Sequence, residues 1–217
     1  MSEYSVKDFG NIANTKVYGL DESIIRAKYP MSVDISTLNN DITKGILALS
    51  NCEKGTGHDQ WLTGVIVQFD LTYTVKAWTE AERYSFLDFI SSQSTMHRIA
   101  KFDLDKSYIE YVDPRIIEIM KEKVAEYNNF NNRVIADDLQ NTINFEEEKS
   151  KKYLEILYSN PCGFKLTAGM TTNYRQLKTI YAQRRTHRLP EWREFCTWIE
   201  TLPMFKELCL RDGETHD

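Results

Sequence analysis

The most informative stretch of this chain is residues 173–194, NYRQLKTIYAQRRTHRLPEWRE. Leu177, Ile180 and Tyr181 recur at helical spacing, so they can pack inward on one face of a helix. The positive charge of the stretch comes from Arg175, Lys178, Arg185, His187 and Arg188. Because the chain as a whole carries a net charge of −5, this concentration of cations predicts a site for an anionic ligand.

Length and composition indicate one domain with a substantial core. The chain has 217 residues, of which 41% are hydrophobic, and no repeat or low-complexity linker divides it. We therefore predict a single domain over residues 1–217. The isoelectric point near 5.5 argues against sequence-independent binding of nucleic acid, which needs a broad basic surface. A local phosphate site remains compatible with this charge.

Cysteine usage and hydropathy predict a cytoplasmic protein with no membrane partner. The four cysteines, Cys52, Cys162, Cys196 and Cys209, are widely spaced and form neither a CxxC pair nor a Cys/His cluster. This pattern is typical of buried free thiols in a reducing compartment, and we expect no metal site. The polar N-terminus lacks a signal peptide, and no apolar run approaches the roughly 18 residues of a membrane span.

The hydrophobic pattern predicts an α+β fold with a helix-rich C-terminal half. Residues 64–73, GVIVQFDLTY, form the best strand, because β-branched and aromatic residues alternate there. Residues 16–20 fit a short strand. Helices are expected over 22–28, 41–50, 75–91, 114–127, 146–158, 191–200 and 204–210, with another beginning near Thr171. The asparagine-rich residues 128–132 should end the 114–127 helix.

A second segment, residues 80–98, leads from a helix into hydroxyl, amide and basic side chains. Trp78, Ala81, Glu82, Ser85, Phe86 and Phe89 mark the expected inner side of that helix. Ser94 and Arg98 lie where the helix should have ended, and such groups can hold a phosphate or a nucleobase. The simpler interpretation is a C-terminal turn in which Arg98 pairs with a nearby carboxylate.

Residues 171–200 also allow a helix-turn-helix interpretation, in which the basic stretch enters a DNA groove. Pro190 argues against it, since it lies where the second helix should begin. The acidic residues Glu191 and Glu194 on that helix also oppose contact with DNA. No nucleic-acid partner is therefore expected.

Taken in order, the two segments resemble the flavin-dependent thymidylate synthases. The resemblance extends from about Val17 to Leu202 and is strongest in two blocks. The C-terminal block of the family, Asn-x-Arg-Ser-Leu followed by Leu-Arg and His-Ala-Gln-Trp-Glu, is matched by Asn173, Arg175, Leu177, Arg184, Trp192 and Glu194. The family signature Arg-His-Arg, with a serine further on, is matched by Arg83 and Ser94.

The chain departs from the family at several ligand-binding positions. Tyr84 and Ser85 replace the second and third residues of Arg-His-Arg. Glu80 stands where a glutamine is expected, and Leu157 where the family has an arginine. The chain thus looks like a divergent member.

The resemblance implies a central twisted, mainly antiparallel sheet flanked by helices, and a homotetramer with its sites between subunits. It implies conversion of dUMP to dTMP, with FAD as cofactor and with NADPH and methylenetetrahydrofolate as co-substrates. Such a site works by binding and electrostatic activation, which explains its reliance on arginines. A nucleotide-binding protein that uses the same scaffold without catalysis is the alternative.

Residue roles follow from motif position. Arg184 corresponds to the catalytic arginine that contacts and polarises the uracil, because a guanidinium can stabilise negative charge on a carbonyl oxygen. Ser94 and Arg98 would hold the dUMP phosphate. The implied cofactor-binding residues are Arg83, Asn173 and Arg175, with either His187 or Arg188 in the place of the family histidine.

Overall fold

The structure is a computed structural model that describes residues 1–53, 55–136 and 143–210, with backbone only at 133–136 and 143–144. Its internal contacts divide the chain into two compact units. Unit 1 comprises Met1–Thr72, Thr79–Ser91 and the residues from Thr167 on, and unit 2 comprises Tyr73–Trp78 and Ser92–Leu166. The single domain over residues 1–217 stays a prediction.

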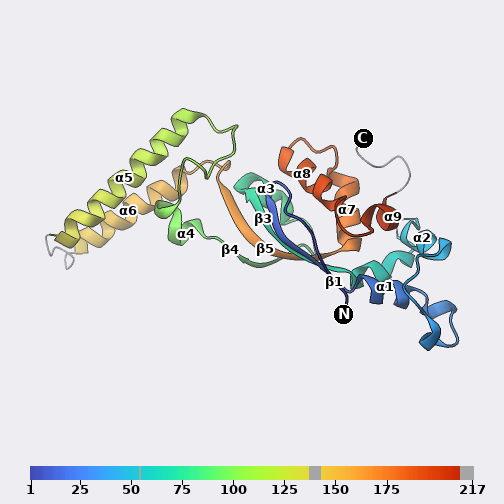
Figure 1. The fold of residues 1–217 in the computed structure, drawn as a ribbon. Coiled ribbons are helices and arrows are strands. Elements are labelled where there is room, and N and C mark those ends of the chain that lie inside the picture. Colours follow the sequence, from blue (N-terminus) through green and yellow to red (C-terminus); the bar gives the residue numbers. More distant parts are fainter. Residues whose placement is uncertain (54, 137–142, 211–217) are drawn as a thin grey trace. The chain divides into compact units, whose positions relative to one another are not determined.

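A five-stranded sheet forms the centre of the fold (Figure 1). Its order is β1 (Glu3–Ser5), β2 (Ile12–Tyr18), β3 (Ile66–Thr74), β5 (Lys165–Asn173) and β4 (Asp88–Ser92). The pairs β1–β2 and β2–β3 are antiparallel, with Val17 opposite Val67 in the second pair. The α+β class and the antiparallel sheet are therefore confirmed.

Helices cover one face of this sheet in unit 1, where α7, α8 and α9 lie together (Figure 1). The helices of the unit are α1 (Leu20–Ala27), α2 (Lys44–Ser50), α7 (Tyr174–Arg184), α8 (Pro190–Ile199) and α9 (Phe205–Cys209), with a 3-10 helix over His58–Gly64. Alternation along β3 buries Val67, Phe69 and Leu71 against them. The ring centroids of Phe69 and Trp198 are 4.6 Å apart, so α8 packs directly on the sheet.

A carboxylate fastens the N-terminal strands of unit 1 to α8. Glu194 accepts hydrogen bonds from the backbone N and the Nδ2 of Asn11, each at 2.8 Å. Gly10 lies directly against this carboxylate with φ 52°, and a Cβ there would come within 1.4 Å of the Glu194 Oε1. A larger residue at that position would therefore be strained and would displace the Glu194 carboxylate from Asn11.

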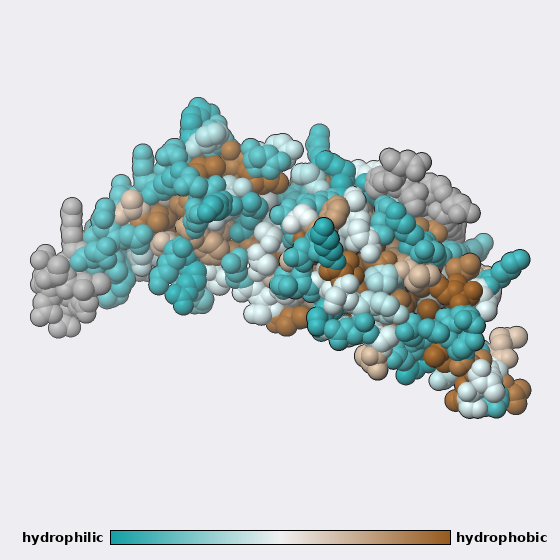
Figure 2. All heavy atoms as spheres, in the orientation of Figure 1, coloured by the Kyte–Doolittle hydropathy of each residue, from teal (hydrophilic) through white to brown (hydrophobic). Residues whose placement is uncertain are grey.

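Unit 2 is built on a helical hairpin. Its helices are α4 (Thr95–Arg98), α5 (Pro114–Ala136) and α6 (Ile143–Ser159), and a 3-10 turn over Ile99–Lys101 follows α4. Helices α5 and α6 run side by side, and hydrophobic residues gather between them (Figures 1 and 2). The buried core of the unit consists of Ile99, Leu104, Tyr108, Met120, Ile156 and Phe164.

The predicted helix over 75–91 is wrong in its second half. Helix α3 covers only Val75–Ala81, and the chain then turns into strand β4. The turn places Phe86 at φ 64°, and the Thr172 hydroxyl donates a hydrogen bond to the Phe86 carbonyl. Pairing at the edge of the sheet thus overrides the helical pattern. As a result Glu82, Ser85, Phe86 and Phe89 are exposed, while Trp78 and Ala81 are buried as expected.

Two further predictions need correction. Helix α5 runs through residues 128–132 instead of ending before them, because packing against α6 stabilises it and Asn128 donates a hydrogen bond to the Ala100 carbonyl. Strand β5 was not predicted at all, since its buried residues Ala168, Met170 and Thr172 are small, flexible or polar. The remaining predicted elements are present with shifted ends, including β2, β3 and α6.

Two absences characterise the residues that the structure describes. No helix among them is long and apolar enough to cross a membrane. The same part of the chain contains no group of three His, Cys, Asp or Glu side chains arranged to hold a metal ion.

Candidate functional site

Arg184 lies at the centre of a compact group in unit 1, which we call the Arg184 cluster: Glu80, Tyr84, Arg184, His187 and Trp192. Arg184 ends α7, and the turn into α8 brings His187 and Trp192 back towards it. Glu80 comes from the end of α3, and Tyr84 from the turn that follows. The early termination of α3 thus positions the Tyr84 side chain.

Hydrogen bonds and aromatic rings fix the Arg184 guanidinium from several sides. Its Nε donates to the Tyr84 hydroxyl at 2.6 Å, and its Nη1 lies 2.9 Å from the Glu80 Oε2 and 2.7 Å from the His187 Nε2. The guanidinium carbon lies 4.8 Å from the centre of the Trp192 ring and 5.3 Å from that of Tyr84. Arg184 is therefore oriented before any ligand binds.

The electrostatics of the cluster keep Arg184 charged but compensated. Burial tends to lower the pKa of Arg184, but its hydrogen bonds to Tyr84 and Glu80 outweigh burial and raise the pKa. The side chain of Arg184 is only 11% exposed, and that of Glu80 is 21% exposed. A carboxylate this close offsets the positive charge that a ligand would meet. This partner arises from the replacement of the glutamine expected at position 80.

Two of the predicted cofactor-binding residues have structural partners inside unit 1. The Asn173 side chain caps α7 by accepting a hydrogen bond from the Gln176 backbone N at 3.0 Å. The Arg175 Nε donates to the Asp59 Oδ1 at 3.0 Å, and its Nη1 donates to the Gln60 side chain at 2.6 Å. These contacts account for both residues without a ligand.

Of the other three predicted cofactor-binding residues, only His187 lies in the Arg184 cluster. His187 belongs to the cluster, whereas the neighbouring Arg188 is exposed. Arg83 is also exposed, in the turn after α3. Of the two residues that could replace the family histidine, His187 is therefore the one beside Arg184.

Ser94 and Arg98 meet in unit 2, in a hollow of about 360 Å³ that we call the Arg98 pocket. Its lining residues are Gln93, Ser94, Arg98, Lys101, Phe102 and Asp103. Ser94 precedes α4 and Arg98 ends it, so one short helical turn brings both side chains to the same pocket. The 3-10 turn that follows adds Lys101, which no sequence motif indicates.

The Arg98 pocket carries uncompensated positive charge. Among the described residues, neither Arg98 nor Lys101 forms an ion pair. The Asp103 carboxylate also lines the pocket, but its Oδ2 lies 3.0 Å from the Lys106 Nζ. Lys106 lowers the pKa of Asp103, and Lys121 contributes to the same shift. Two cations therefore face the pocket beside a carboxylate that already has its own partner, an arrangement suited to an anion.

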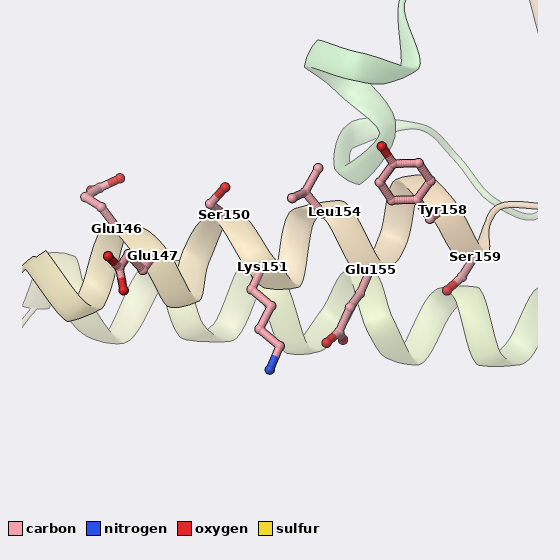
Figure 3. Close-up of a pocket in the computed structure, with 8 residues that line it drawn as sticks. All are labelled: Glu146, Glu147, Ser150, Lys151, Leu154, Glu155, Tyr158 and Ser159. Atoms are coloured by element: carbon pink, nitrogen blue, oxygen red, sulfur yellow. The ribbon is translucent and has the colours of Figure 1, made fainter.

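A larger hollow, of about 830 Å³, lies along α6 and is lined by that helix alone (Figure 3). Ser150, Leu154 and Tyr158 project on one side of the helix, and Lys151 and Glu155 on the other. Leu154 is 42% exposed and Tyr158 is 87% exposed. The hollow is thus the open surface of one helix and lacks the convergent groups of a ligand site.

The helix-turn-helix interpretation does not suit this structure. The second helix, α8, is buried through Trp192, Phe195 and Trp198, which pack into the core of unit 1. A recognition helix instead needs an exposed face that can enter the major groove.

Local spacing explains which site residues the sequence could reveal. Ser94 and Arg98 are neighbours on one turn and could be found from their spacing. Glu80 and Arg184 are 104 positions apart, and no pattern within a segment predicts their contact. The clearest available signal was a carboxylate at position 80 in place of the expected glutamine.

Comparison with known proteins identifies the fold. The chain is similar to the crystal structure of flavin-dependent thymidylate synthase ThyX from Helicobacter pylori complexed with FAD and dUMP, with a TM-score of 0.59 and 13% identity. The match covers 98% of this chain and 99% of the other. A second structure of Helicobacter pylori ThyX with FAD and dUMP gives a TM-score of 0.60 and 13% identity, over 92% of this chain and 96% of the other. No family model and no curated protein matches the chain. The resemblance is thus confirmed as a shared fold over nearly the full length.

Proposed function

We propose that this chain is a divergent flavin-dependent thymidylate synthase-like protein that binds a uracil nucleotide. In this proposal it converts dUMP to dTMP, with FAD as cofactor and with methylenetetrahydrofolate and NADPH as co-substrates. The observation that carries the proposal is the Arg98 pocket, which unites Ser94 and Arg98. These two residues correspond by motif position to the phosphate-binding residues of the family.

The phosphate part of the nucleotide fits the residues that are present. A phosphate oxygen can accept hydrogen bonds from the Ser94 hydroxyl and from the Arg98 guanidinium, which binds such groups with two parallel donors. Both side chains line a hollow open to solvent. A phosphate that enters this hollow can therefore meet both side chains.

The base is assigned to Arg184. Its guanidinium is held against Trp192 and Tyr84, so it needs little reorganisation when a ligand arrives. Arg184 would donate a hydrogen bond to a carbonyl oxygen of the uracil and stabilise negative charge there. Glu80 weakens this effect, because it already accepts a hydrogen bond from the same guanidinium.

The flavin fits the residues of one chain poorly. Asn173 caps a helix and Arg175 pairs with Asp59, so neither side chain is available as it stands. Arg83 and Arg188 are exposed and belong to unit 1. We propose that a second copy of the chain completes the flavin site in a homotetramer.

A second candidate function is nucleotide binding without catalysis. The compensation of Arg184 by Glu80 favours it, because a guanidinium paired with a carboxylate activates a carbonyl less strongly. The loss of the second and third residues of Arg-His-Arg, now Tyr84 and Ser85, favours it as well.

The visible spectrum of the purified protein separates these functions. Bound FAD should give a yellow protein with absorbance at about 450 nm. Titration with dUMP should then perturb that band, and NADPH with methylenetetrahydrofolate should yield dTMP. Binding of dUMP by a colourless protein that takes up no added FAD would support the non-catalytic function. Failure to bind dUMP in either form would refute both functions.

A further inference from the structure

The Arg98 pocket contains one basic residue that the family motif does not include. Lys101 follows Arg98 by one 3-10 turn, and that turn is fixed by Ile99, which is fully buried in the core of unit 2. Arg98 precedes the buried Ile99 in the sequence and Lys101 follows it, and both side chains line the same hollow.

We propose that Lys101 is a specificity-determining residue that makes the Arg98 pocket select a phosphate monoester, which is a dianion, over a phosphodiester, which carries one charge. The inference deepens the proposed function, since it concerns the phosphate of the same nucleotide. It assigns a terminal phosphate to this pocket and excludes the pyrophosphate of a dinucleotide from it.

The charge around the pocket supports this assignment. Arg98 offers a planar donor pair that suits two oxygens of one phosphate, and Lys101 supplies a separate point charge. The Coulomb energy scales with the charge of the ligand, so a dianion gains about twice as much from the second cation as a monoanion does. Lys101 therefore contributes mainly to the affinity for the doubly charged ligand.

Asp103 restricts where that ligand can lie. Its carboxylate lines the pocket and would repel a phosphate, but Lys106 holds it at 3.0 Å and Lys121 stands nearby. An ester group carries no charge and meets less repulsion at this wall than a charged oxygen does. The ligand should therefore direct its charged oxygens towards Arg98 and Lys101 and its ester oxygen towards Asp103.

The test compares two small probes on the full-length protein at pH 8. Inorganic phosphate is mostly dianionic at this pH, and dimethyl phosphate is a monoanion with two ester groups. Amide chemical-shift titrations give the dissociation constant of each probe. Wild-type protein should bind inorganic phosphate more tightly than dimethyl phosphate, with shifts centred on residues 93–103.

The variant Lys101→Gln should weaken binding of inorganic phosphate about fivefold, the size expected for one solvent-exposed charge pair. It should change the affinity for dimethyl phosphate much less. Lys101→Arg keeps the charge and should restore most of the preference. Lys151→Gln is the matched control, because this exposed lysine of unit 2 carries the same charge and lies on α6.

Equal effects of Lys101→Gln and Lys151→Gln on inorganic phosphate would overturn the inference, as would the absence of phosphate binding by the wild type. If Lys101→Gln, but not Lys151→Gln, weakens binding of inorganic phosphate more than binding of dimethyl phosphate, the inference stands, even where a separate failure to bind dUMP refutes the proposed function. If dUMP binds through Ser94 and Arg98 but Lys101→Gln changes nothing, the inference fails while the proposed function survives.

Discussion

At the scale of single residues, the contact between Glu80 and Arg184 bears most directly on function. The two side chains meet at 2.9 Å, in a place where the family pattern leads one to expect a neutral glutamine. Under the proposed function Glu80 competes with the ligand for the same guanidinium, so it should lower the affinity of the Arg184 cluster for a carbonyl or an anion. The neutral side chain at this position should therefore favour ligand binding.

The variant Glu80→Gln tests this competition. It keeps an oxygen that can accept from Arg184 but removes the negative charge, so the affinity for dUMP should rise about fivefold. Glu82→Gln serves as the control, since this exposed neighbour makes the same change in net charge. Isothermal titration calorimetry measures both variants. An unchanged or weaker affinity in Glu80→Gln would show that Glu80 does not compete with the nucleotide.

Arg184 also stabilises the fold, which affects how its role can be tested. The variant Arg184→Ala removes the Arg184 guanidinium from the largely buried Glu80 carboxylate and should lower the free energy of unfolding by about 2 kcal/mol. Urea denaturation measures this loss. In the double variant Glu80→Gln, Arg184→Ala the loss should be smaller, because the carboxylate that Arg184 compensates is removed as well. If both variants lose the same free energy, the pair does not contribute as described.

At the scale of elements, Asn173 shows how a residue assigned to a ligand can serve a helix. The variant Asn173→Ala should lower the free energy of unfolding by about 1 kcal/mol through loss of the α7 cap. Asn173→Asp should retain the cap, since aspartate accepts the same hydrogen bond. Thermal denaturation and FAD titration together separate the roles. If Asn173→Asp retains stability and loses FAD affinity, then the amide also contacts the cofactor.

Helix α1 responds to acid through Glu22. Hydrogen bonds from Ser2 lower the pKa of Glu22 from its ordinary value of 4.5 to about 2. A depressed pKa means that the stabilisation is complete above pH 4.5 and is lost as the pH falls towards 2. The variant Glu22→Gln should therefore be less stable than wild type at pH 6, by about 1 kcal/mol, and equally stable near pH 2. Thermal melts across this range provide the measurement, and a pH-independent difference would contradict the assignment.

Elements also show what sequence patterns can predict. Strand β3 was predictable because Val67, Phe69 and Leu71 lie on one buried face and alternate with residues that are less buried. Strand β5 was not, because the residues of its buried face, Ala168, Met170 and Thr172, are small, flexible or polar and give only a weak apolar pattern. The end of α3 was missed because a long-range hydrogen bond from Thr172 favours the turn at Phe86. Where neighbours along the chain determine an element, the pattern predicts it, and where distant strands do, it does not.

The candidate site follows the same rule. The meeting of Ser94 and Arg98 needed only one local turn, so their spacing already suggested it. The partner of Arg175, Asp59, comes from a 3-10 helix far away in the sequence, and only the fold brings it there. The Arg98 pocket was therefore accessible to sequence reasoning, whereas the internal pairing of the arginines was not.

At the scale of the whole molecule, the four cysteines report on its integrity. Cys196 and Cys209 are buried, and burial raises the pKa of the Cys196 thiol to about 12. Cys162 is exposed and Cys52 is partly exposed. A maleimide reagent should therefore label Cys162 and Cys52 in the folded protein and the other two only after unfolding, as peptide mass spectrometry can show. Rapid labelling of Cys196 under native conditions would be inconsistent with this fold.

The hydrogen bonds between Asn11 and Glu194 have a consequence for folding during synthesis. The two residues are 183 positions apart, and a ribosome that adds about 5–20 residues per second needs about 10–40 s to synthesise the chain between them. For most of that time the strands β1 and β2 exist without the helix that holds them. Unit 2, drawn mostly from the continuous stretch Ser92–Leu166, is synthesised in full before α8 appears. We expect the inserted segment to fold first and the N-terminal strands to reach their final place only when synthesis is nearly complete.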